Sequence, residues 1–90
     1  MAKVIKAAGA ITDVQPKNGK FFELEELQKV VGGYIEIIDL GNDEIMVVNE
    51  EGKLEDLPYN FFATQMYQRS TRALDYIAGD ALVCLSSQIR

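Results

Sequence analysis

The fold is decided by residues 34–48, which read Tyr34-Ile35-Glu36-Ile37-Ile38-Asp39-Leu40, then Gly41-Asn42-Asp43, then Glu44-Ile45-Met46-Val47-Val48. Both outer segments are rich in β-branched side chains, which favour strands. The segment between them contains residues that turn the chain readily. Residues 34–40 and 44–48 are therefore predicted to form a β-hairpin. Because apolar residues occupy consecutive positions in each segment, both strands are expected to be central strands of a sheet.

Helices are predicted before and after this hairpin. Residues 23–31 carry apolar side chains at helical spacing, and Gly32-Gly33 follows them as a helix end. A second helix is predicted over residues 61–69, with Asn60 as its N-cap. Further strands are predicted at residues 4–8, 11–14 and 81–85. These elements predict a single α+β domain over residues 1–90, with a mostly antiparallel sheet and both helices packed on one face.

Composition and charge exclude several classes of protein. The chain has 90 residues and a net charge of −5, and residues 41–58 alone carry six acidic residues against one lysine. A partner rich in phosphate needs a basic face, so nucleic-acid binding is not expected. No apolar run is long enough to cross a membrane. A single cysteine, Cys84, permits no internal disulfide, which favours a cytoplasmic location. So small a core also favours a homo-oligomer.

The chemistry available to the chain is limited. Histidine is absent, which removes the common catalytic triads and imidazole metal sites. No phosphate-binding loop or calcium-loop pattern occurs. Cys84 lies between Val83 and Leu85 and is expected to be an inert core residue. We therefore expect no cofactor, no metal and no catalytic residue.

The candidate binding residues cluster around the second helix. Four aromatic residues fall within nine positions, at 59, 61, 62 and 67, which is more than one helix face of a thin core can bury. Two arginines follow and could face one anion or simply lie in solvent. Asn60 is expected to be a cap, with a ligand-lining role as the alternative. The predicted interface or binding surface comprises Tyr59, Asn60, Phe61, Tyr67, Arg69 and Arg72.

Several blocks of the sequence together resemble a known family. They include Val31-Gly32-Gly33-Tyr34-Ile35-Glu36, Asn49-Glu50-Glu51-Gly52-Lys53, Pro58, Asn60, Ala63-Thr64 and Asp75-Tyr76-Ile77-Ala78-Gly79-Asp80. The family consists of small proteins of bacteria, their phages and mobile elements, described as a domain of unknown function. The resemblance implies a mobile-element setting and no particular reaction. Its members often carry a basic residue where this chain has Phe61, which argues against an anion-binding role for that position.

Three functions are compatible with these observations. The first is a non-catalytic binding module, a phage or mobile-element accessory protein that binds a host protein or sequesters a small ligand. The second is a small enzyme that uses only Asp, Glu, Lys or Tyr groups. The third is a nucleic-acid-associated protein. The missing histidine and the acidic balance favour the first, with a protein or subunit interface preferred to a ligand pocket.

Overall fold

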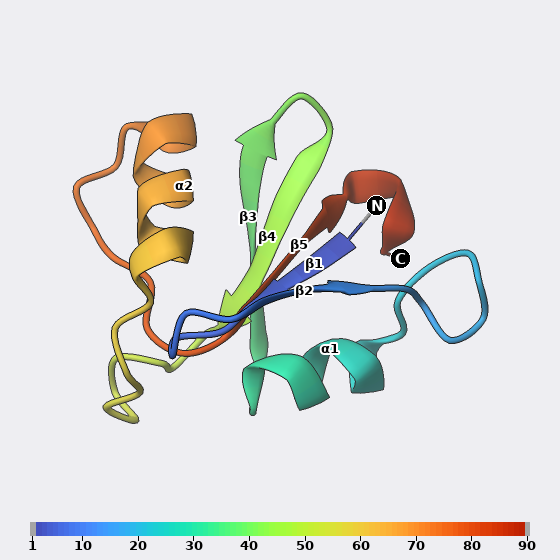
Figure 1. Ribbon diagram of the computed structural model, residues 1–90, viewed down its shortest axis with the longest axis horizontal. Helices are drawn as coiled ribbons and strands as arrows, with labels where there is room; N and C mark the ends of the chain where they lie inside the picture. Colours follow the sequence, from blue (N-terminus) through green and yellow to red (C-terminus); the bar gives the residue numbers. More distant parts are fainter. Residues whose placement is uncertain (1, 90) are drawn as a thin grey trace.

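The computed structural model describes residues 2–89, which form one antiparallel five-stranded sheet with two helices (Figure 1). The strands follow one another across the sheet in the order β2-β1-β5-β4-β3. The elements in chain order are β1 (Ala2–Ile5), β2 (Ile11–Val14), α1 (Leu24–Val31), β3 (Ile35–Gly41), β4 (Glu44–Asn49), α2 (Phe61–Thr71), β5 (Ala81–Leu85) and a short 3-10 turn (Ser86–Gln88). The predicted α+β class with an antiparallel sheet is confirmed.

The predicted hairpin is present as β3 and β4, paired from Ile35 opposite Asn49 to Gly41 opposite Glu44. Its turn consists of Asn42 and Asp43, with φ angles of 54° and 64°. Two successive left-handed residues are typical of a tight hairpin turn, because they match the twist of the strands. β4 is a central strand, as predicted.

The prediction that β3 is also central is wrong, because β3 lies at the margin of the sheet. Consecutive apolar residues of β3 point to the two opposite faces of the sheet, and this pattern does not require a strand on each side of β3. Ile38 packs with the core on the α2 side, whereas Ile37 remains 47% exposed on the opposite side.

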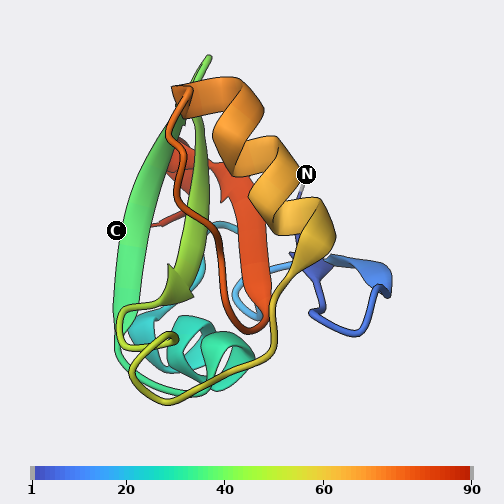
Figure 2. The same cartoon turned by 90° about the vertical axis from the view of Figure 1, so that its left-hand side faces the viewer.

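The two helices cover opposite faces of the sheet (Figure 2). Successive residues of a strand point to opposite faces. On β5, Leu82 and Cys84 therefore join a core cluster with α1, whereas Ala81 and Val83 join a second cluster with α2. The prediction that both helices pack on one face is wrong. The central strands are apolar on both faces, so each face requires its own cover.

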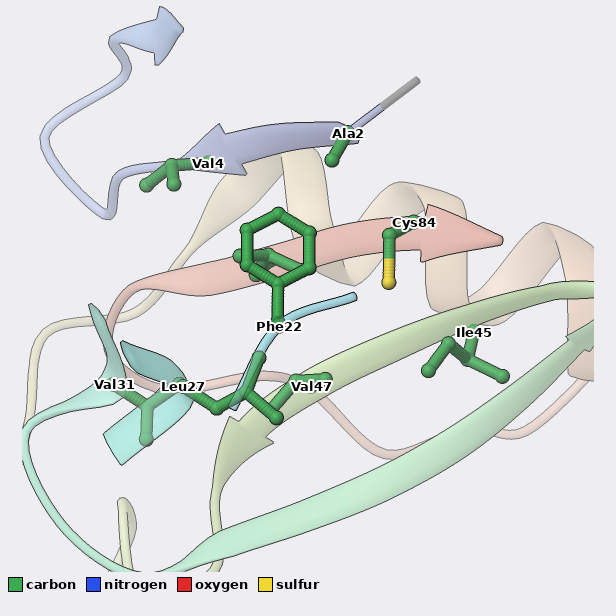
Figure 3. Close-up of a cluster of buried hydrophobic side chains, with 9 residues drawn as sticks. Ala2, Val4, Phe22, Leu27, Val31, Ile45, Val47 and Cys84 are labelled. Carbon is green, nitrogen blue, oxygen red and sulfur yellow. The ribbon is translucent and has the colours of Figure 1, made fainter. Parts of the chain in front are cut away.

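The cluster beneath α1 is built around Phe22 (Figure 3). Leu27 and Val31 of α1 are each only 3% exposed in this cluster. Phe22 is held by its backbone N–H, which donates to the carbonyl of Gln88 at 2.6 Å. Cys84 is buried in the same cluster, and this burial raises the pKa of its thiol to about 11. Its predicted place in the core is confirmed.

The connection between β4 and α2 consists of successive turns over residues 50–56. It packs tightly against the segment that precedes β5. A Cβ added at Gly52 would lie 2.7 Å from the carbonyl oxygen of Ala78, so only glycine permits this approach. Helix α2 then runs two residues beyond its predicted end and finishes at Thr71. Over residues 2–89, no helix combines the length and apolar character required to cross a membrane.

Candidate functional site

Helix α2 is fixed to the sheet at its N-terminus by Asn60, which is fully buried. Its side-chain oxygen accepts the N–H of Ala63 at 3.1 Å, so the predicted N-cap is confirmed. Its side-chain nitrogen donates to the carbonyls of Ile5 at 2.8 Å and Gly79 at 2.9 Å. Asn60 therefore joins three segments of the chain. Because its side chain lies below the surface, Asn60 does not form part of a contact surface, contrary to the prediction.

The inner side of α2 is made of small and polar residues. Ala63 is fully buried, and Thr64 is 2% exposed. The Thr64 hydroxyl accepts the N–H of Ile77 at 2.9 Å, which ties the helix to the segment before β5. Tyr67 is half-buried and packs against the core cluster on the α2 side of the sheet, to which Ala63 belongs. Tyr67 thus belongs to the inner side of the helix and is separated from Phe61.

The outer side of α2 presents large apolar side chains to solvent. Phe61 is 52% exposed and Phe62 is 46% exposed, with their rings in edge-to-face contact at 5.3 Å. Tyr59 is 53% exposed and lies 5.7 Å from the ring of Tyr76. Tyr59 itself precedes the helix. Met66 and two exposed arginines join the two phenylalanines in a surface that we name the α2 outer face: Phe61, Phe62, Met66, Arg69 and Arg72.

The two arginines lie at the C-terminal end of this face. Arg72 is the C-cap of α2, with φ 60°, and its backbone N–H donates to the carbonyl of Gln68 at 2.9 Å. Both residues are exposed, and within residues 2–89 neither takes part in an ion pair. Their guanidinium groups are therefore available to an acidic partner.

A hollow of about 380 Å³ lies beside β3 and β4, lined mainly by the turns after β4 and by the segment before β5, with Tyr67 as the one contribution from α2 in the described part of the chain. Its lining includes Tyr67, Tyr76, Ile38 and the polar pair Lys53 and Asp75. The Lys53 ammonium pairs with the Asp75 carboxylate and lies 4.7 Å from the centre of the Tyr76 ring. The hydrogen bond from Lys53 lowers the pKa of Asp75, with a further contribution from the Tyr76 N–H. Because the pair neutralises itself, it is not arranged as a separate acid and base.

The acidic residues of segment 41–58 are all exposed: Asp43, Glu44, Glu50, Glu51, Glu55 and Asp56. Asn49 precedes the turns of this segment and is buried. Its side-chain oxygen accepts the N–H of Glu51 at 2.7 Å, which stabilises the turn, and its side-chain nitrogen donates to the carbonyl of Val31 at 3.1 Å. The latter bond satisfies an end carbonyl of α1. Among residues 2–89, no three Cys, Asp or Glu side chains are grouped so as to hold a metal ion.

Phe62 and Met66 of the α2 outer face, and Tyr76 beside Tyr59, were not among the predicted site residues. The apolar residues at positions 62, 63, 66 and 67 recur at helical spacing, but only Ala63 of these is fully buried. A signal was nevertheless present, because Asn60, Ala63, Thr64 and Tyr67 follow the helical spacing more closely. Small residues at that spacing let the helix approach the sheet and turn the larger side chains outward.

Comparison with known proteins identifies one family. The model of a domain of unknown function, DUF3846, matches residues 4–88. The chain belongs to this family. No curated protein and no solved structure gives a significant match.

The residues by which the sequence resembles this family have mainly structural roles. Gly32 caps α1, Asn49 binds the end of the same helix, and Gly52 permits a close backbone approach. Asn60 and Thr64 hold α2 to the sheet. The resemblance therefore rests on the framework of the fold, whereas the exposed α2 outer face lies largely beyond it.

Proposed function

We propose that this protein is a non-catalytic binding module that self-associates through the α2 outer face. The observation that carries this proposal is the pair of half-exposed rings of Phe61 and Phe62 on a helix whose inner side alone packs on the sheet, with Tyr59 exposed just before the helix begins. Aromatic side chains of this size contribute strongly to protein interfaces and remain costly to hydrate. A second copy of the chain would cover them.

Charge supports a second copy as the occupant. Arg69 and Arg72 lie at the end of α2 that points the same way as the tip of the β3–β4 hairpin (Figure 1). The hairpin tip begins segment 41–58, which carries six acidic residues and one lysine. In a pair of copies, arginines of one could meet acidic residues of the other. Such contacts would bring specificity and would weaken at high salt.

The same proposal places the protein in the cytoplasm, as an accessory protein of a phage or mobile element. A lone buried cysteine, Cys84, supports a reducing compartment. The resemblance stated above supports the mobile-element setting. Its biological action would be to bind a host protein once assembled.

The test is the oligomeric state of the purified chain, measured by light scattering and native mass spectrometry at low and high salt. We expect an oligomer at low salt that dissociates as salt rises. Phe61→Ser should shift it toward the monomer, and Arg69→Glu should do the same at low salt. Ile11→Ser is the matched control, because Ile11 is 51% exposed on β2, away from α2.

A wild-type chain that remains monomeric at every concentration would overturn the proposal. So would an oligomer that Phe61→Ser and Arg69→Glu leave unchanged while circular dichroism shows an intact fold. Equal loss in the Ile11→Ser control would place the interface elsewhere.

A further inference from the structure

The outer edge of β3 is open to a partner strand. Within residues 2–89, β3 pairs only with β4, and it follows the margin of the sheet (Figure 2). The carbonyl of Tyr34, just before β3, accepts the N–H of Glu50, just after β4. Continued along the register, this pattern directs the backbone groups of Glu36 and Ile38 toward β4. In an antiparallel pair this direction alternates. The backbone N–H and C=O groups of Ile35 and Ile37, and the N–H of Asp39 just before the register shift, therefore point to the open edge.

An apolar groove accompanies this edge on the α1 side of the sheet. It has a volume of about 380 Å³, and its lining includes Leu24, Ile35, Ile37 and Ile89. Leu24 is 57% exposed and Ile37 is 47% exposed, although both are large apolar residues. A strand added beside β3 would direct every second side chain to this face. The groove is placed to receive such side chains.

The charges around this edge select the chemistry of the partner. Glu36 and Asp39 lie on β3 itself, Glu23 lines the groove, and Glu50 and Glu51 follow at the end of β4. Apart from Glu23, these acidic residues belong to the β3–β4 hairpin or to the turns that follow it. A partner with lysine or arginine between its apolar residues would complement these acids. A second copy would bring its own Glu36 and Asp39 to the same edge, which disfavours pairing of β3 with itself.

The opposite margin of the sheet differs. β2 has four residues against seven in β3, and its Asp13 is engaged by Lys3 at 2.6 Å. Short strands and paired charges are devices that make an edge a poor template for another strand. β2 nevertheless carries Ile11, whose exposure of 51% is close to the 47% of Ile37. The two isoleucines provide a matched comparison between the edges.

We propose that β3 binds an extended, basic segment of another protein by strand addition, with apolar side chains at alternate positions entering the groove. Main-chain hydrogen bonds to Ile35, Ile37 and Asp39 would supply the binding common to any sequence. The groove would favour apolar side chains at alternate positions of the segment, and the surrounding acidic residues would favour basic side chains between them. This surface is distinct from the α2 outer face, so its test is independent of self-association.

The probe is a synthetic peptide of alternating lysine and valine, seven residues long, whose affinity is measured by fluorescence anisotropy. Nuclear magnetic resonance should show shifts and slowed amide exchange at Ile35, Ile37 and Asp39. A peptide of alternating glutamate and valine should bind at least about tenfold more weakly, as should a lysine–valine peptide with proline at its centre. The proline peptide retains the positive charge but lacks a central N–H.

Variants of the two edges complete the experiment. Ile37→Lys should weaken binding about tenfold, whereas Ile11→Lys should leave it unchanged. Ile37→Thr removes apolar surface but retains β propensity, and should give a loss in the same direction without a change of fold. Equal binding of the proline peptide, or of Ile37→Lys and wild type, would overturn the proposal, since either result would indicate diffuse charge attraction. Pairing of β3 with its copy in solution would overturn it too.

Discussion

Helix α1 and helix α2 cover opposite faces of one sheet, but they bury different kinds of side chain. α1 inserts Leu27 and Val31, each 3% exposed, into its face of the sheet. α2 presents Ala63 and Thr64 to the other face and leaves Phe62 46% exposed. The large apolar side chains of α1 therefore form part of the core. Those on the outer side of α2 remain available for contact with a partner.

The anchoring of the two helices differs in the same way. Asn49 extends from the sheet to the C-terminal end of α1, where it donates to the carbonyl of Val31. Asn60 belongs to the start of α2 and extends to the carbonyls of Ile5 and Gly79. α1 combines one buried amide with large apolar contacts, whereas α2 depends far more on polar contacts. The stability of α2 should therefore be the more sensitive to the loss of one amide.

The largest effect is expected from Asn60→Ala. The change removes the N-cap, at about 1 kcal/mol. It also leaves the carbonyls of Ile5 and Gly79 without this donor, at about 1–3 kcal/mol each. We expect the free energy of unfolding, measured with urea, to fall by about 3–7 kcal/mol, a large share of the stability of so small a domain.

Asn60→Ser is the matched control, because serine caps a helix well but does not extend to Ile5 or Gly79. It should recover only about 1 kcal/mol of the loss. Full recovery would show that Asn60 acts only as a cap. Asn49→Ala should be milder than Asn60→Ala, and the reverse order would contradict the comparison of the two helices.

A second test exchanges large side chains for alanine on the two helices. Leu27→Ala should lower the free energy of unfolding by about 3 kcal/mol, because it creates a cavity beside Phe22 in the α1 cluster. Phe62→Ala should cost less than about 1 kcal/mol when measured at low protein concentration, although it removes more atoms. Equal costs would mean that the outer side of α2 contributes to the core of the single chain.

The smallest effects separate the two glycines that follow α1. Gly32 has φ 80° and no atom within 4 Å of an added Cβ, so Gly32→Ala should cost about 1 kcal/mol through backbone conformation alone. An added Cβ at Gly33 would lie 2.9 Å from the Asn49 side-chain nitrogen. Gly33→Ala should therefore cost about 1 kcal/mol or more by displacing that amide.

A double-mutant cycle distinguishes the two causes. In an Asn49→Ala background the cost of Gly33→Ala should largely disappear, whereas that of Gly32→Ala should remain. Unfolding free energies of the four variants, measured by urea titration, give the result. An unchanged cost of Gly33→Ala in this background would contradict the role assigned to Asn49.

The sequence by itself determined the type of most local elements and several of their ends. The strands of the central hairpin, the turn at Asn42-Asp43, the cap at Asn60 and the helix end at Gly32 all follow from residues close together in the chain. Strand propensity, side-chain capping and left-handed backbone conformations are local properties, so local patterns predict them. The burial of Cys84 was predicted for a related reason, since a short, wholly apolar strand must lie inside the sheet.

The tertiary structure alone decided the placement of these elements. The two helices lie on opposite faces because adjacent apolar residues of each central strand point to different faces, and no local pattern assigns a helix to a face. Asn60 is buried because its amide meets Ile5 and Gly79, which are far from it in the sequence. The open edge of β3 arises from the strand order. Each of these features depends on which distant segments meet, and this depends on the packing of the whole chain.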